Sequence, residues 1–130
     1  MTWEKNQILV SFPAAVDLTD YQYRAVVLGS DGTVNLPQTD VTQKAVGILQ
    51  NAPDIGEEAV VAVAGVSKAV AASQLDAGVL VGPEWVDDLG DSGKVIATVP
   101  TAYTLGITIS VAAAEDDLVS VLLGNIAVIT

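Results

Sequence analysis

Short apolar runs separated by turn residues make up most of this chain. The clearest runs are Tyr23–Leu28, Ala59–Ala64, Gly78–Val81 and Leu118–Leu123, and Gly, Pro, Asp and Ser fall between them. Val and Ile dominate the runs, and β-branched side chains are suited to the pleated surface of a sheet. Short strands at close spacing, with Gly-rich turns, predict an all-β fold, a small β-sandwich or barrel.

The pattern repeats within the chain. When Gly47 is laid on Gly106, an offset of 106 − 47 = 59, several further positions match without a gap. They are Ile48 with Ile107, Glu57-Glu58 with Asp116-Asp117, Val60 with Val119, Val63 with Leu122, and Gly65 with Gly124. Two similar halves packed together are therefore expected, with pseudo-twofold character.

Each copy of the repeat predicts the same hairpin. A strand runs through Gly-Ile, the chain turns at the acidic pair, and a strand returns over Ala59–Ala64 or Leu118–Leu123. A glycine inside an apolar strand indicates a bulge or a close backbone approach, which we expect at Gly47 and Gly106. Carboxylates at a turn mark a solvated tip.

The segment Val66–Leu75 is ambiguous because its alanines favour a helix. It is short for an uncapped helix, and Gly78 follows closely. We therefore expect a strand over Ser67–Ala71 and at most one helical turn over Ser73–Asp76.

Residues 1–16 stand outside the matched positions and are expected to form an extended N-terminal arm, with residues 17–130 as a single β domain. The arm alternates Ile8, Val10 and Phe12, with Leu9 on the other face, and Pro13 ends any ladder. A free apolar strand invites pairing with another chain, so we expect a binding element formed by Trp3, Ile8, Leu9, Val10 and Phe12. Two alternatives remain open: Trp3 and Phe12 as core residues, and the arm as the first strand of the domain itself.

Composition removes most catalytic chemistry. The 130 residues include no Cys and no His, so thiolate sites, Ser-His pairs and Cys-His pairs are impossible. There is no glycine-rich phosphate loop. The sequence predicts a protein that is not an enzyme, with no cofactor and no metal ion.

Charge and hydropathy limit the partners. The chain carries 16 acidic and 5 basic residues, a net charge of −11, which disfavours nucleic acid. No apolar run approaches the length of a membrane helix, and the start is not a good signal peptide, so we expect no membrane partner and synthesis in the cytoplasm. A mean hydropathy of +0.50 is high for a soluble monomer and suggests that some apolar surface is buried against other chains; the alternative is simply a sequence rich in Ala and Val.

Carboxylates are the remaining chemical candidates. A hydrolase with two carboxylates is disfavoured because the acidic pairs are neighbours at turn tips rather than facing each other across a cleft. The stretch Glu84–Asp91 is acid-rich, but Leu89 stands where an EF-hand calcium loop needs an oxygen ligand. We expect a surface loop there, with Trp85 tucked beneath it.

The order of motifs resembles a known family. It runs aromatic-Arg-Ala-Val-Val-Leu (Tyr23–Leu28), Gly-Ile-Leu (Gly47–Leu49), a Pro-containing acidic turn (Ala52–Glu58), Val60–Val66, Asp76–Val81, Ser92–Val95, Leu105–Ile107 and Leu118–Leu123. Over about residues 20–124 this order resembles the small capsid decoration proteins of tailed bacteriophages, also called cement or head-stabilising proteins. Each motif is short and apolar, so the order carries the resemblance, which does not cover the N-terminal arm or the residues after Gly124.

The resemblance implies a structural virion protein on the capsid exterior. Such a protein bridges major capsid protein subunits, stabilises the head and commonly forms a homotrimer. The alternative is a small β-barrel that binds a ligand or carbohydrate, for which Trp85 and Tyr103 are the best candidate residues.

Overall fold

The computed structural model describes residues 5–37, 45–84, 92–98 and 104–124. These residues form nine strands and no helix, so none that could cross a membrane. The strands are β1 (Lys5–Pro13), β2 (Ala25–Leu28), β3 (Val34–Asn35), β4 (Ala45–Leu49), β5 (Glu58–Val70), β6 (Leu80–Pro83), β7 (Val95–Ala97), β8 (Gly106–Thr108) and β9 (Leu118–Leu123). The predicted all-β class is confirmed, and the segment after Val70 continues as bends rather than a helical turn.

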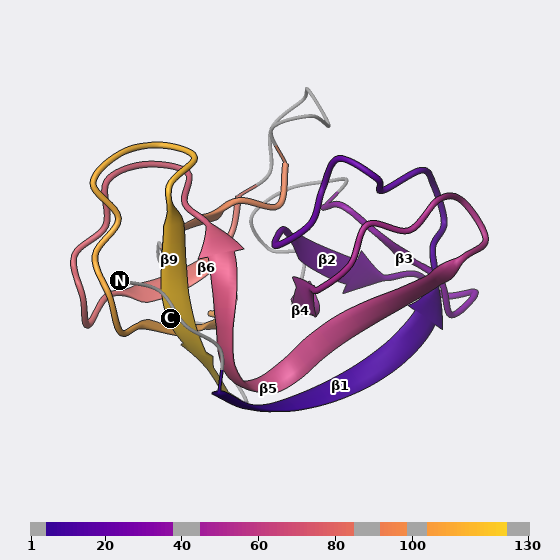
Figure 1. Cartoon of the computed structure of the whole chain (residues 1–130), viewed down its shortest axis with the longest axis horizontal. Helices are drawn as coiled ribbons and strands as arrows, with labels where there is room; N and C mark the ends of the chain where they lie inside the picture. Colours follow the sequence, from indigo (N-terminus) through magenta and orange to yellow (C-terminus); the bar gives the residue numbers. More distant parts are fainter. Residues whose placement is uncertain (1–4, 38–44, 85–91, 99–103, 125–130) are drawn as a thin grey trace.

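All nine strands belong to one antiparallel sheet in the order β3-β2-β4-β5-β9-β8-β6-β7, with β1 paired to β5. Ala62 pairs with both Leu9 and Ile48, and Val66 pairs with both Lys5 and Leu122. Therefore β1 occupies one edge of β5, whereas β4 and then β9 occupy the other. In Figure 1, β5 runs alongside β1 and then turns upward, so that two lobes rise from its ends.

The first lobe consists of β1–β4 with residues 58–64 of β5, and the second consists of residues 65–70 of β5 with β6–β9. The two lobes make equivalent backbone hydrogen bonds. Gly56 N donates to Ala14 O at 2.9 Å, and Asp116 N donates to Ala71 O at 2.8 Å. Ala14 makes a parallel bridge to Val34, as Ala71 does to Val95. The predicted pair of similar halves is confirmed.

The offset of 59 holds for only part of the repeat. It relates β4 to β8, but Gly56 corresponds to Asp116, an offset of 116 − 56 = 60, because the second hairpin has one extra residue. Both residues have positive φ, 78° and 71°. Ala14 corresponds to Ala71, an offset of 71 − 14 = 57.

This last offset makes residues 62–70 of β5 the counterpart of β1. Phe12 pairs with Ala59 as Ala69 pairs with Val119, and Leu9 pairs with Ala62 as Val66 pairs with Leu122. The expectation that the N-terminal segment has no counterpart in the repeat is wrong for Lys5–Pro13, because its partner position is the continuation of β5. That residues 1–16 act separately from residues 17–130 stays a prediction.

Glycine is required where the hairpins touch the neighbouring strand. A Cβ on Gly47 would lie 2.2 Å from Ala62 O and 2.7 Å from Val61 Cγ1. A Cβ on Gly106 would lie 2.3 Å from Leu122 O and 2.9 Å from Val121 Cγ1. The predicted close backbone approach is confirmed at both positions.

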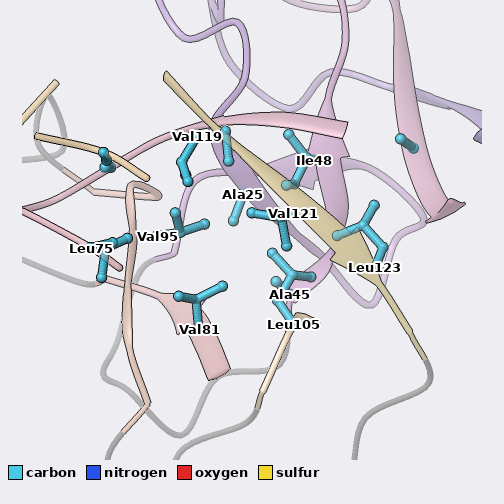
Figure 2. Close-up of a cluster of buried hydrophobic side chains, with 14 residues drawn as sticks. Ala25, Ala45, Ile48, Leu75, Val81, Val95, Leu105, Val119, Val121 and Leu123 are labelled. Carbon is cyan, nitrogen blue, oxygen red and sulfur yellow. The ribbon is translucent and has the colours of Figure 1, made fainter. Parts of the chain in front are cut away.

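Two hydrophobic clusters hold the lobes. One lies within the first lobe and includes Leu18, Val26, Val34, Leu49 and Val61. The other fills the second lobe but also contains first-lobe residues, namely Ala25, Ala45, Ile48 and Ala62. Figure 2 shows Ala25, Ala45 and Ile48 among Val121, Leu123 and Leu105. The core of the second lobe therefore packs against the side of the first-lobe sheet that faces away from the first-lobe core.

Candidate binding surfaces

Strand β1 presents apolar side chains to solvent. Ile8 is 59% exposed, Leu9 51% and Val10 39%, whereas Phe12 is half-buried against the first-lobe core. Trp3 lies outside the described residues. The structure therefore places Ile8, Leu9 and Val10 together on one accessible strand and gives Phe12 a core contact as well.

The backbone of β1 is available on one side. Its pairing with β5 runs from Lys5 to Pro13, and no other described strand pairs with it. A strand with an unpaired edge and exposed apolar side chains is a template for strand addition by another chain. However, β1 is a paired strand of the sheet rather than a free arm, so any partner would meet an ordered edge.

A second apolar surface lies on the outer side of the second lobe. Directly paired residues on antiparallel strands point to the same face of a sheet. Leu80 pairs with Ile107, Ile107 with Leu122, and Leu122 with Val66. Leu80 is 49% exposed and Leu122 45%, while Ile107 and Val66 are half-buried. We call these four residues the open row.

The first lobe has an equivalent row of four residues, but three of them are buried. Its members are Ala25, Ile48, Ala62 and Leu9, joined by the equivalent pairings. Ala25, Ile48 and Ala62 have no exposed surface, because they belong to the core cluster of the second lobe. We call these four residues the covered row, although its end member Leu9 stays 51% exposed.

The acidic pairs are exposed, as predicted, but they also hold their turns. Glu57 Oε1 accepts a hydrogen bond from Asp54 N at 2.7 Å. At the equivalent position, Asp117 Oδ2 accepts from the backbone N of Ala113 and Ala114, each at 3.2 Å. These carboxylates stabilise a turn and do not face one another across a cleft.

The acidic turn of the second lobe also neutralises a buried cation. Lys94, whose side chain is 3% exposed, places Nζ 2.7 Å from Asp116 Oδ1 and 3.2 Å from Glu115 Oε2. The equivalent residue of the first lobe is Thr33, because Gly29 N bonds Thr33 O as Glu84 N bonds Lys94 O. Thr33 instead donates to Asp31 in its own turn. The sequence offered no sign of this difference.

Sites for other chemistry find little support in the part of the chain that the structure describes. Those residues include no cluster of three or more acidic side chains able to hold a metal ion. The ligand-binding candidates Trp85 and Tyr103, and most of the acidic stretch Glu84–Asp91, lie outside the described residues.

Comparison with solved structures places the fold beside that of a known protein. The fold is similar to that of a phage head-fiber base. That protein is the N base of the head fiber gp8.5 in bacteriophage phi29, with a TM-score of 0.64 and 17% sequence identity, over 90% of this chain and 95% of the other. No protein-family model matches the chain, and no curated protein matches its sequence.

Proposed function

We propose that this chain is a non-enzymatic structural protein of a phage virion, bound to the exterior of the head. It is made in the host cytoplasm, binds the major capsid protein, bridges neighbouring capsid subunits and stabilises the head, with three copies of the chain forming one unit. The shared fold with a head-fiber base supports attachment to a head. The exposed strand β1 is the observation that carries the proposal.

The attachment element is β1 with the residues that precede it, so that Trp3, Ile8, Leu9, Val10 and Phe12 contact the capsid. Main-chain bonds from the unpaired edge of β1 would provide affinity, and alternate side chains would fill pockets. Ile8 and Leu9 are more than half exposed, so about 1 kcal/mol each is available from burying what remains accessible. Together they account for about a 30-fold difference in affinity.

Co-sedimentation with purified heads that lack this protein tests the proposal. The double variant Ile8→Ser/Leu9→Ser should bind heads about 30-fold more weakly, while the free energy of unfolding changes by no more than about 1 kcal/mol. The matched control is Ile55→Ser/Val111→Ser, because these side chains are 64% and 57% exposed but lie away from β1. Equal binding by both double variants would contradict attachment through β1.

The bridging role has its own measurement. If the protein joins neighbouring subunits, several modest contacts act together through effective concentration. Decorated heads should then release DNA at a higher temperature than bare heads, and heads carrying the Ile8→Ser/Leu9→Ser variant should behave as bare heads. Release at the same temperature with and without the bound protein would remove the stabilising role and leave attachment intact.

A further inference from the structure

The covered and open rows are the same structural feature in two environments. By the pairings given above, Ala25 corresponds to Leu80, Ile48 to Ile107, Ala62 to Leu122 and Leu9 to Val66. In the first lobe the second lobe covers Ala25, Ile48 and Ala62 but leaves Leu9 exposed, and in the second lobe no described residue covers the row. The chain thus contains its own example of what covers such a row.

The covering surface belongs to the second lobe. Ala69, Leu105 and Leu123 share a core cluster with Ala25, Ile48 and Ala62 of the covered row. Ser67 adds a bond across the lobes, because its Oγ accepts from Gln50 Nε2 at 2.8 Å. All four residues are buried.

The first lobe carries the equivalent surface without a cover. Its residues are Val10, Phe12, Val46 and Val63, the counterparts of Ser67, Ala69, Leu105 and Leu123. Val10 is 39% exposed, and the other three are only half-buried. We call these four residues the uncovered face. Val10 and Phe12 lie on the opposite side of β1 from Leu9, because successive residues there pair with successive residues of β5.

We propose that copies of this chain associate head to tail, with the open row of one copy covered by the uncovered face of the next. This specifies the self-association stated under the proposed function, and it does not depend on attachment to a capsid. In the assembly Val10 and Phe12 of the proposed attachment element contact the next copy instead, and Trp3, Ile8 and Leu9 remain for the capsid. A second copy is the fitting occupant because one chain supplies both surfaces, and because the counterparts of these two surfaces are joined once inside it, with Ala25 and Ala62 in place of Leu80 and Leu122. Both surfaces are apolar, so contact removes exposed apolar area from water.

The bonds between the lobes predict bonds between copies. Within the chain, Ala25 N donates to Gly93 O at 2.7 Å. The equivalent residues are Leu80 and Gly32, so Leu80 N of one copy should donate to Gly32 O of the next. One bond has no equivalent: Val70 N donates to Tyr23 O at 3.0 Å, but its counterpart Pro13 has no N–H.

A head-to-tail contact joins two different surfaces, so it either closes into a ring or grows into a filament. With three copies, a closed ring would contain six lobes. Each lobe in it would be covered in the way that the first lobe is covered inside the chain.

Sedimentation of the purified full chain tests the proposal without capsids. Leu122→Asp places a charge in the open row, and Val10→Asp places a charge in the uncovered face. Both side chains are substantially exposed, so both variants should fold with an unfolding midpoint close to that of the parent protein. The parent protein should form a discrete oligomer, and each variant alone should lose it.

Mixing the two variants distinguishes a head-to-tail contact from a symmetric one. The mixture retains one intact open row and one intact uncovered face, so it should give a one-to-one heterodimer and nothing larger. Two results would overturn the proposal: a monomeric parent protein at all concentrations tested, or an oligomer lost with Leu122→Asp but kept with Val10→Asp, which would mean that open rows pair with each other. Ile55→Asp and Val111→Asp are the controls, and both should keep the oligomer.

Discussion

The two lobes have matching strand pairings but differ in what packs against their equivalent rows. In the first lobe the covered row has small residues, Ala25 and Ala62, where the second lobe packs closely. The open row has Leu80 and Leu122 at the same positions, and both are about half exposed. Side-chain size at equivalent positions therefore follows the local packing partner, while the matched backbone hydrogen bonds of Gly56 and Asp116 are kept.

The lobes differ as well in how they hold their turns. In the first lobe Asp31 accepts hydrogen bonds from Thr33 N and Oγ1 within one turn. In the second, Lys94 reaches from the equivalent position to the acidic turn of the following hairpin. The first lobe therefore holds this turn by a contact within the turn, whereas the second lobe joins two turns. Removing the acidic side chains should therefore destabilise the two lobes by different amounts.

The largest effect is expected where both lobes share a steric requirement. Gly47→Ala and Gly106→Ala should each destabilise the protein by about 3 kcal/mol or more, because the new Cβ would overlap a backbone carbonyl oxygen. Gly56→Ala is the control, since its φ is 78° but no atom lies within 4 Å of a Cβ there. It should cost about 1–2 kcal/mol in denaturant unfolding. A cost near zero at Gly106 would break the equivalence of the hairpins.

The next effect separates the covered row from the open row. Ile48→Ala should cost about 2–5 kcal/mol, because Ile48 is fully buried between the lobes. The equivalent Ile107→Ala should cost about 1 kcal/mol or less in the monomer, because Ile107 is partly exposed. Unfolding at low protein concentration measures both. Equal costs would mean that the open row is covered within the isolated chain.

These comparisons also show what the sequence could and could not predict. Apolar runs and turn residues located most strands, and Gly47 and Gly106 marked the close approach because only glycine fits there. The counterpart of β1 was missed although Ala14-Ala15 and Leu18 match Ala71-Ala72 and Leu75. Turns of unequal length change the offset along the chain, so a comparison at the single offset of 59 passes over that match.

The candidate surfaces were harder to predict than the strands. Ile8, Leu9 and Val10 were expected to be accessible and are exposed, since their alternation had no obvious partner. The open row was not predicted, because Leu80, Ile107, Leu122 and Val66 lie on four strands and become one surface only through register. Burial of Ala25 and Ala62 likewise depends on how the lobes pack, which an apolar run alone does not reveal.

A smaller effect is expected at the ion pairs of the second lobe. The variant Glu115→Gln/Asp116→Asn should lose about 1–3 kcal/mol, because it removes the negative charges of two carboxylates that contact the buried Lys94 ammonium. Asn tolerates the positive φ of residue 116 as Asp does, so backbone strain is matched. Glu58→Gln, on the exposed acidic turn of the first lobe, should stay within about 0.5 kcal/mol. Equal, small effects would mean that both acidic turns are only solvated tips.

The smallest effect concerns the first-lobe turns that use Asp-Thr contacts instead of a lysine. Hydrogen bonds from the Thr33 hydroxyl and then its backbone N–H hold the pKa of Asp31 below its ordinary value, whereas at Asp17 the backbone N–H of Thr19 contributes most to lowering the pKa. Thr33→Val should therefore raise the pKa of Asp31 by more than Thr19→Val raises the pKa of Asp17, in a carboxyl carbon NMR titration. A pKa lowered by folding stabilises the protein above the pKa of the unfolded chain, and this contribution disappears as the pH falls through the folded-state pKa. Both carboxylates are exposed, so the loss on acidification below the ordinary aspartate range should be slight, and each variant should make it slighter still. An unchanged Asp31 titration in Thr33→Val would show that the hydroxyl does not hold this turn, and the contrast with Lys94 in the second lobe would then rest on the ion pairs alone.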